Sequence, residues 1–459
     1  MTTSHDEPHG NGALPCRGFT TASWVLEVLA VLVGSLWATT LAIAARADNS
    51  PATIIQVGTR SLQEVIQAAP PHSIVLCDRN HPLTLSTPVI IDKPLTLRGI
   101  NAKLPDGLGN TSLIVVQTAG VSITDFELHG NASSVKQADR APLLRIHAGD
   151  FAVERGLFVD SSKDGVMIEA ADKDIVGGVV RDIVGVGVIR DTVSISGGNE
   201  GAKIRNVLVD NVRGYRSSLR GAVEVSDGTD NVTVRKVYAQ ECVYAVDVQD
   251  HNRPLQANRN VVVQDIYALG CKHAIRTANS PKGHINLTIR DVTAERCEIP
   301  LKLSHTDNLI LQGVRVIDHN SPKTPITVTN CHGLTIRDVT IMNTTSKEAA
   351  LLVQDCDQTT IDGLVLRGAT PNLTSAVSFL ATTGKPLSGL CIHNVLAPSV
   401  RPAGILLSAE RKGGTLTDYL ISDNLARVET IMTTTNGLLR NNLPEAQERH
   451  QPAASPDKQ

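Results

Sequence analysis

The chain has 459 residues, more than one ordinary hydrophobic core needs, and a formal net charge of −3 with a pI near 6.5. This charge gives no basic footprint and argues against a nucleic-acid-binding protein. Aromatic residues make up only 3% of the chain, whereas Gly, Val, Ile, Thr, Asn and Asp are plentiful, which is typical of strands joined by tight turns.

The N-terminus has the pattern of a targeting segment. A polar lead with Arg17 precedes the apolar run WVLEVLAVLVGSLWATTLAIA, and Ala45-Arg46-Ala47 fits a small-x-small cleavage site. We predict a signal peptide over residues 1–47; because the run is long enough to span a bilayer, an uncleaved signal anchor is the alternative. Both interpretations predict an extracytoplasmic protein, which is secreted, periplasmic or anchored to a membrane by this segment.

The segment after the leader predicts the start of a folded domain. SLQEVIQAAPPHSIVLC at residues 61–77 has the pattern of a short amphipathic helix that leads into a strand. PVIIDKPLTLRG at residues 88–99 follows as a pair of short strands. At the other end, the composition of residues 443–459 predicts a disordered tail.

A seven-residue motif of the form N-V-T-I-R-D-V recurs along the chain. Its period of 22–30 residues, with β-branched strands and polar turns, is typical of a solenoid. Period-two alternation, broken by Gly or Asn, disfavours helical repeats. The copies are GVSITDF at 120, GAKIRNV at 201, NVTVRKV at 231, NVVVQDI at 260, NLTIRDV at 286, NLILQGV at 308, GLTIRDV at 333 and QTTIDGL at 358.

A second short strand precedes most copies by about ten residues. Stacked in parallel, two or three such strands per coil bury alternate residues in a narrow stem. The second strands are GVMIEA at 165, AVEVSD at 222, AVDVQD at 245, AIRTAN at 274, PLKLSH at 300, PITVTN at 325, LLVQDC at 351, AVSFLA at 376 and GILLSA at 404.

Together, these patterns resemble the right-handed parallel β-helices of the pectin-lyase-like superfamily, over about residues 55–440. The resemblance implies an all-β fold, a solenoid of about 12–13 coils spanning residues 55–442. It also implies that the helix near residue 61 caps the N-terminal end, where an uncovered coil would expose a sheet edge.

Seven cysteines follow the leader, an odd number that cannot all pair within one chain. Cys242, Cys271 and Cys297 each lie four residues before the first apolar residue of a second strand, and Cys331 and Cys356 share another register. Equivalent residues of neighbouring coils stack at about 4.8 Å. We predict a ladder of buried free thiols, with a metal or redox role as the alternative.

The outward central residue of each second strand forms a column with segregated charges. Two acids, Glu224 and Asp247, are followed by two bases, Arg276 and Lys302. A ladder built for stability would alternate signs, because like charges on neighbouring strands repel. We interpret the column as a binding site; a solvated charged face is the alternative. The other members are Arg145, Met167, an unassigned coil near Ile189, Thr327, Leu352, Ser378 and Leu406.

Lyases with this fold suggest a chemistry for the column. They remove the proton α to a uronate carboxylate and expel the 4-linked oxygen, which requires a base and a group that neutralises the carboxylate. The resemblance implies Lys302 as base and Arg276 as its catalytic partner. Glu224, Asp247 and Asp250 are candidate ligands for a Ca²⁺ cofactor.

Further residues at the ends of these strands are candidate contacts to an acidic polysaccharide. They are Tyr244, His251, Arg253, His273 and His305, of which His251 and Arg253 belong to the long turn QDHNRP. A lone His in such a place is more often a hydrogen-bonded turn residue. The chain is predicted to be a monomer with no nucleic-acid partner.

Several motifs of known families with this fold are missing, which keeps other functions open. The chain has no convincing Arg-x-Pro stretch or aspartate-rich patch of pectate lyases, and no Gly-His-Gly of polygalacturonases. It matches the Asp-Pro-His-Asp of alginate epimerases only loosely, at residues 250–254. A hydrolase, an epimerase and a non-catalytic polysaccharide-binding or surface solenoid are therefore alternatives to the lyase.

Overall fold

The computed structural model describes residues 52–198, 201–251, 257–277, 283–369, 371–409 and 414–443. The predicted signal segment, Arg253 and nearly all of the predicted C-terminal tail lie outside these residues. No helix of the described part of the chain is long and apolar enough to cross a membrane.

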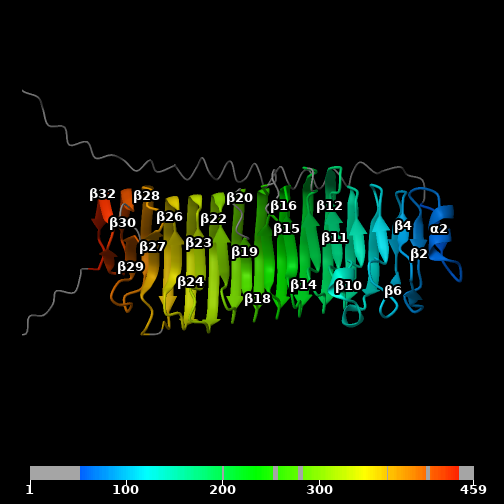
Figure 1. The fold of residues 1–459 in the computed structure, drawn as a ribbon, viewed down its shortest axis with the longest axis horizontal. Helices are drawn as coiled ribbons and strands as arrows, with labels where there is room; N and C mark the ends of the chain where they lie inside the picture. Colours follow the sequence, from blue (N-terminus) through cyan, green and yellow to red (C-terminus); the bar gives the residue numbers. More distant parts are fainter. Residues whose placement is uncertain are drawn as a thin grey trace, which may run out of the picture. The chain divides into compact units, whose positions relative to one another are not determined.

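The described residues form a right-handed parallel β-solenoid of about 13 turns, which confirms the predicted fold class. Its strands belong to two parallel sheets, and neighbours in a sheet come from successive coils (Figure 1). From β7 onward each coil places one strand in each sheet, with the core between the two sheets, whereas the first coils place additional short strands in the larger sheet.

The first sheet, here called sheet A, has 18 strands in the described chain. They are β1 (Ile54–Gln56), β2 (Ile74–Leu76), β3 (Leu83–Thr84), β5 (Thr96–Arg98), β6 (Asn101–Lys103), β8 (Ser122–His129), β10 (Phe151–Val159), β12 (Ile175–Val186), β14 (Ile204–Tyr215), β16 (Thr229–Gln240), β18 (Arg259–Leu269), β20 (His284–Glu295), β22 (Thr306–His319), β24 (His332–Thr344), β26 (Asp357–Arg367), β28 (Leu387–Leu396), β30 (Thr415–Ser422) and β32 (Thr433–Arg440).

The second sheet, here called sheet B, has 14 strands in the same residues and carries the predicted charged column. They are β4 (Val89–Ile91), β7 (Ile114–Val116), β9 (Leu144–Ile146), β11 (Val166–Glu169), β13 (Val193–Ser196), β15 (Gly221–Ser226), β17 (Tyr244–Gln249), β19 (His273–Thr277), β21 (Leu301–Ser304), β23 (Ile326–Thr329), β25 (Ala349–Gln354), β27 (Ser375–Ala381), β29 (Ile405–Ala409) and β31 (Val428–Thr430).

The recurring motif is explained by two left-handed backbone positions in each coil. In NLTIRDV, Asn286 has φ 57° and Asp291 has φ 55°, a region that Asn and Asp tolerate better than other non-Gly residues. The first position also builds a ladder: Asn286 Nδ2 donates to Asn260 Oδ1 at 2.9 Å and Asn308 Nδ2 donates to Asn286 Oδ1 at 3.0 Å. Asn and Asp thus mark where the strand of sheet A begins and bends.

One repeat boundary predicted from the sequence is wrong. The sequence places one copy of the motif at GAKIRNV, which begins at residue 201. In the structure this copy begins at Asn206, which has φ 59° and whose Oδ1 accepts a hydrogen bond from Asn231 Nδ2 at 2.7 Å. Ile204 pairs with Thr229, so these residues lie before the turn rather than after it. The true motif is NVLVDNV, which begins 25 residues before the next copy.

The cysteine ladder is confirmed. All seven cysteines of the described residues are free, and six of them are buried. Cys242, Cys271 and Cys297 approach a main-chain carbonyl oxygen of the preceding coil, with Sγ–O distances of 3.6, 3.5 and 3.6 Å. These thiols fill the stem as small apolar groups.

A short helix, α2 (Leu62–Ala68), occupies the residues where the sequence predicts one. Leu62, Val65 and Ile66 are buried against the first coils. The side chain of Gln63 bonds both polar backbone groups of Ile90 in β4: Nε2 donates to the carbonyl at 3.2 Å and Oε1 accepts from the N–H at 2.7 Å. In the described part of the chain the other helical segments are single 3-10 turns, Ala132–Ser134 and Gln137–Asp139.

Candidate functional site

The column predicted on the second strands is present in sheet B with the expected register. Glu224 pairs with Asp247, Asp247 with Arg276, and Arg276 with Lys302. The coil left unassigned in the sequence contributes Ser194, which pairs with Glu224. The two acids and two bases therefore occupy four successive rungs on one side of the sheet.

The exposure of these four residues differs from the prediction. Glu224 is 1% and Asp247 0% exposed, although both point away from the stem. The Arg276 side chain is 28% exposed, and Lys302 is exposed. The two acids are thus covered by other side chains, and the bases form the accessible part of the column.

Arg276 covers Asp247 and pairs with it through two nitrogens. Nε donates to Oδ1 at 3.0 Å and Nη2 donates to Oδ2, which is the bidentate geometry of a strong ion pair. Its guanidinium carbon also lies 4.9 Å from the centre of the Tyr244 ring. Burial raises the pKa of Asp247, an effect that Arg276 partly offsets.

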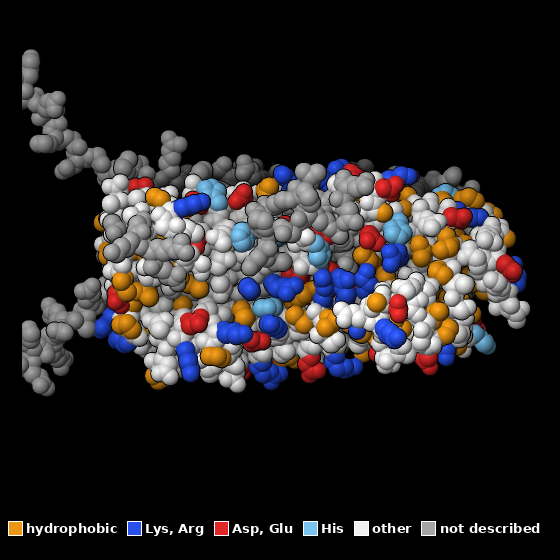
Figure 2. All heavy atoms as spheres, in the orientation of Figure 1, with side chains coloured by type: hydrophobic (Ala, Val, Ile, Leu, Met, Phe, Trp, Pro, Cys, Tyr) orange, Lys and Arg blue, Asp and Glu red, His pale blue; other side chains and the backbone are white. Residues whose placement is uncertain are grey.

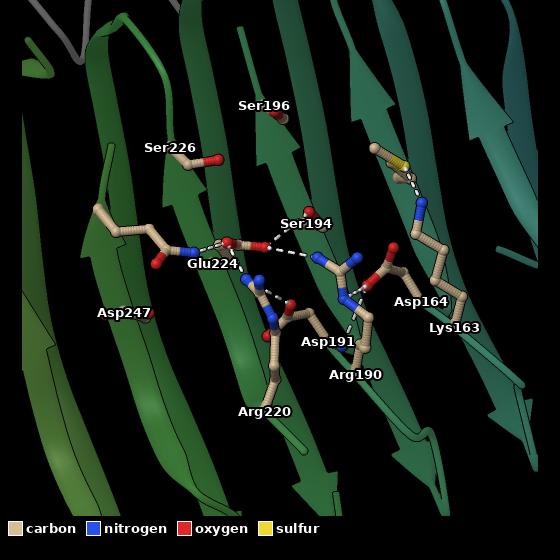
Figure 3. Close-up of polar contacts among 12 residues, drawn as sticks. Lys163, Asp164, Arg190, Asp191, Ser194, Ser196, Arg220, Glu224, Ser226 and Asp247 are labelled. Atoms are coloured by element: carbon tan, nitrogen blue, oxygen red, sulfur yellow. Dashed lines mark hydrogen bonds and ion pairs between the residues drawn. The ribbon is translucent and has the colours of Figure 1, made fainter. Parts of the chain in front are cut away.

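Two more arginines cover Glu224 (Figure 3). Arg220 Nη1 donates to Oε1, and Arg190 Nη2 lies 3.5 Å from Oε2. Ser194 Oγ donates to Oε2 at 3.2 Å, and the Gln249 amide donates to Oε1. Burial acts to raise the pKa of Glu224, but Arg220 and the other donors outweigh it and hold the pKa below its usual value. Glu224 is therefore ionised and saturated with donors.

Two buried acids that the sequence reasoning missed, Asp164 and Asp191, complete the cluster. Arg190 Nε lies 3.6 Å from Asp164 Oδ1, and Tyr244 donates its hydroxyl to Asp191 Oδ1 at 2.9 Å. Burial raises the pKa of Asp191 well above its usual range, and the carboxylates of Glu224 and Asp164 raise it further. Burial and these neighbouring carboxylates therefore favour the protonated form of Asp191.

The arginines of the cluster lie over its buried acids. Asp164, Glu224 and Asp247 are each within ion-pair distance of a guanidinium group, and these groups belong to Arg190, Arg220 and Arg276. The acids are fully buried, whereas the three arginine side chains are 24%, 23% and 28% exposed. Each guanidinium is thereby held by an acid below and keeps an edge toward solvent.

A signal for the missed arginines was present in the sequence. Lys163, Arg190 and Arg220 each stand three residues before the first core valine of their strand in sheet B, so they occupy one register in three consecutive coils. Asp164 and Asp191 follow directly, which gives the repeated pairs Lys-Asp and Arg-Asp. A search for charge at fixed offsets in the turns, and not only within the strands, finds them.

His251 lies at the edge of the cluster with a fixed orientation. Its ring Nδ1 lies 2.7 Å from Oδ2 of the fully buried Asp227, and its main-chain N–H donates to Oδ1 at 2.8 Å. The other ring nitrogen, Nε2, is 3.7 Å from Glu224 Oε1, and the side chain is 37% exposed. An acid thus holds the imidazole with its second nitrogen toward the column, a geometry suited to proton transfer.

Two residues predicted to contact a substrate, Tyr244 and His273, are buried and do not reach the surface in this structure. Tyr244 is 0% exposed and uses its hydroxyl on Asp191, so it positions the cluster from below. His273 is 3% exposed, and its Nδ1 donates to the carbonyl of Ile299 at 2.8 Å. Burial lowers the pKa of His273 to about 4, so this ring is neutral and structural.

The remaining predicted residues lie at the corner where the strands of sheet B end. Asp250 is 5% exposed, and His305 has φ 48° with its Nε2 3.4 Å from Asn330 Nδ2. The main-chain N–H of the buried His284 donates to the carbonyl of His305 at 2.7 Å, and burial lowers the pKa of His284 to about 4.

The donor set does not fit the predicted calcium site in its present arrangement. Within the described residues, no three His, Cys, Asp or Glu side chains are grouped so that they could hold a metal ion. The oxygens of Glu224 and Asp247 already accept hydrogen bonds from Arg220 and Arg276. A Ca²⁺ cofactor stays a prediction.

The cations of this region form a continuous surface, here called the basic face: Arg145, Lys163, Arg190, Arg220, Lys272, Arg276 and Lys302. Figure 2 shows Lys and Arg side chains gathered over the coils that carry β11 to β19. Lys302 and Lys272 make no ion pair within the described residues. Because the acids beneath are buried, the surface presented to a ligand is positive.

No protein-family model and no curated protein matches the chain. Among solved structures, the N-terminal fragment of bacteriophage Phi29 gene product 12 is similar, with a TM-score of 0.52 and 13% identity over 82% of this chain and 76% of that chain. This likeness is one of fold, the parallel β-solenoid. At this identity the likeness concerns the β-helix alone.

Two enzymes with lower scores also align with the β-helix. The mannuronan C-5 epimerase AlgE4 A-module of Azotobacter vinelandii has 11% identity and a TM-score of 0.47, over 80% of this chain and 91% of that chain. The family 28 exopolygalacturonase of Yersinia enterocolitica has 13% identity and a TM-score of 0.41, over 73% and 79%.

Proposed function

We propose that the protein is an extracytoplasmic, carbohydrate-active β-helix protein that binds an acidic polysaccharide on its basic face and cleaves it by β-elimination. One observation carries the proposal: a row of partly exposed cations, three of them anchored on fully buried carboxylates. Anchored guanidinium groups are pre-organised for bidentate contacts to carboxylates, the charged groups of uronate chains.

The burial of the acids favours elimination over hydrolysis. Glycoside hydrolases require two carboxyl groups that reach the glycosidic oxygen and the anomeric carbon. In the cluster, Asp164, Asp191, Glu224 and Asp247 are all at most 1% exposed and cannot touch a sugar without rearrangement. The groups that do reach solvent are cations and one imidazole, which suit removal of a proton next to a carboxylate.

The elimination step assigns a role to each accessible group. Arg276, with Arg220, binds the uronate carboxylate and stabilises the negative charge that develops when the α proton leaves. Lys302, in its unprotonated form, takes that proton from C5. The C4–oxygen bond then breaks, a C4=C5 double bond forms, and the electron pair goes to the leaving oxygen. His251 is placed to protonate this oxygen.

The test is an ultraviolet absorbance screen of the purified chain against pectate, alginate and glycosaminoglycans. A lyase produces a 4,5-unsaturated sugar that absorbs, whereas a hydrolase produces new reducing ends without absorbance. Lys302→Ala is expected to abolish the signal with nearly unchanged thermal stability, since Lys302 is exposed. Lys347→Ala, an exposed lysine outside the basic face, is the matched control and should keep the full rate.

The outcomes separate the candidate functions. Reducing ends without absorbance would establish a hydrolase, and a change of sugar configuration without cleavage would establish an epimerase. Affinity for the polysaccharide without either signal would establish a binding protein. A normal rate in Lys302→Ala would remove this lysine from the mechanism.

We also propose that α2 serves as the N-terminal cap of the solenoid. Its Gln63 side chain occupies both the N–H and the carbonyl of Ile90 on the first strand of sheet B, groups that would otherwise stay open for a further strand. Gln63→Ala frees these groups, and we expect self-association that Gln67→Ala does not produce.

A further inference from the structure

A second surface with ligand-binding character lies on sheet A, away from the basic face. A hollow of about 480 Å³ opens over β14, β16 and β18. It is lined by Asn211, Arg213, Tyr215, Lys236, Val237, Tyr238, Asp265 and Tyr267. None of these residues belongs to the column or to the cluster described above.

The hollow gathers most of the accessible aromatic surface of the described chain. The four described phenylalanines, Phe126, Phe151, Phe158 and Phe379, are buried, and so is Tyr244. Of the four other tyrosines in the sequence, three line this hollow. Tyr267 is exposed and Tyr215 and Tyr238 are half-buried, and such a group on three consecutive coils is more than the packing of the stem requires.

The three rings form a continuous wall along the solenoid. The centroids of Tyr215 and Tyr238 are 5.6 Å apart with planes tilted by 47°, and those of Tyr238 and Tyr267 are 5.7 Å apart and stacked at 10°. Tyr267 is 36% exposed at the end of the stack. Since the rings repeat with the coil spacing of about 4.8 Å, a polymer that runs along the solenoid contacts more than one ring.

Two cations beside the rings supply charge. Arg213 is exposed and makes no ion pair within the described residues, and Lys236 is 60% exposed, with its Nζ 3.8 Å from Asp210. Arg213 stands in the same register as Tyr238 and Tyr267, one and two coils away. An available guanidinium next to a row of phenol rings is complementary to a sugar with an apolar face and a carboxylate on its edge.

We propose that this hollow is a second binding site for an acidic polysaccharide, distinct from the basic face. Tyr238 and Tyr267 contact the sugar rings, and Arg213 pairs with a carboxylate. Such a site holds a polymer on the opposite sheet without taking part in its cleavage. Two sites on one solenoid raise the effective concentration of polymer at the basic face, provided that the chain is long enough to reach both.

Hydroxyl-radical footprinting with mass spectrometry tests the proposal, because it reads each tyrosine separately in the full chain. With polygalacturonate or alginate as probe, oxidation of Tyr238 and Tyr267 is expected to fall, while Tyr419, outside the hollow, keeps its rate. Neutral dextran should give no protection. Arg213→Ala is expected to weaken this protection about tenfold in probe concentration, as for a lost charge-assisted contact.

Arg315→Ala is the matched control, since Arg315 stands in the same column of sheet A two coils beyond Tyr267. It should leave the protection unchanged. Equal protection in wild type and Arg213→Ala, equal protection by dextran, or none by either acidic polymer would each overturn the proposal. The footprint in Lys302→Ala separates it from the proposed function, because loss of cleavage there must leave the protection of the tyrosines intact.

Discussion

The pair of Arg276 and Asp247 offers the sharpest test of the charge arrangement. We consider Arg276→Met, which keeps the aliphatic part of the side chain and removes the guanidinium. Asp247 is 0% exposed, so the variant leaves a buried carboxylate without its bidentate partner. Breaking a buried pair in this way costs about 3–5 kcal/mol. Because Arg276 is 28% exposed, water replaces part of the pair, and we expect a loss of about 2–3 kcal/mol.

The loss should depend on pH with a definite sign. Burial already raises the pKa of Asp247 above its unfolded value of about 3.9, and removal of Arg276 raises it further. Above pH 4 the native state then binds more protons than the unfolded state, so stability falls as pH rises through the folded pKa. The destabilisation by Arg276→Met is therefore expected to be larger at pH 8 than at pH 5.

Amide hydrogen exchange measures this effect coil by coil, which suits a repeat architecture in which neighbouring coils stabilise one another. The opening free energy of β17 and β19 should fall, and that of β27 and β29 should not. Asp247→Asn combined with Arg276→Met removes both charges and should recover most of the loss. The reasoning is refuted if the single variant costs less than about 0.5 kcal/mol, or if the double variant is no more stable than the single one.

Three further predictions follow from buried groups. The pKa of His273 is lowered to about 4, so between pH 6.5 and 4 only the unfolded state binds its proton, and the free energy of unfolding decreases by up to ~3 kcal/mol as the pH is lowered through this range. His273→Asn should flatten this pH dependence in urea titrations, and an equal pH dependence in the variant would contradict the assignment. The thiols of Cys331 and Cys356 should resist a thiol reagent until the chain unfolds; rapid native-state labelling would contradict their burial. Chelation by EDTA should leave polysaccharide binding unchanged because arginines already neutralise the buried acids; a loss that CaCl₂ restores would reveal the cation site predicted from the sequence.

The fold could be predicted from the sequence because its determinants are local. Asn and Asp at left-handed positions, period-two alternation and a fixed coil length all lie within one repeat, as Asn286 and Asp291 illustrate. The column from Glu224 to Lys302 followed from the same counting, since residues at one offset must stack in a parallel sheet. The boundary at Asn206 was missed because GAKIRNV, five residues earlier, resembles the motif in its letters, although the true copy keeps the common spacing.

The burial of the site could not be predicted in the same way. Whether Glu224 is open to solvent depends on Arg190 and Arg220, which come from turns whose side chains fold over the neighbouring coil. Tyr244 meets Asp191 across 53 residues, a contact between coils that no pattern within one repeat contains. Protonation of Asp191 then depends on the sum of these contacts, which only the assembled cluster fixes.

The stacking of identical turns has a consequence for how such a chain can lengthen in evolution. Each coil closes with a left-handed residue and repeats its hydrogen bonds to the coil before it, as in the ladder of Asn260, Asn286 and Asn308. Tandem duplication of one whole coil would therefore insert a rung of about 4.8 Å and leave every outward side chain on its original side. An insertion of a single residue within a strand would instead point the charged side chains beyond it toward the core of the solenoid. Whole-coil duplication is thus the route by which this protein could extend its binding surface to longer polymers.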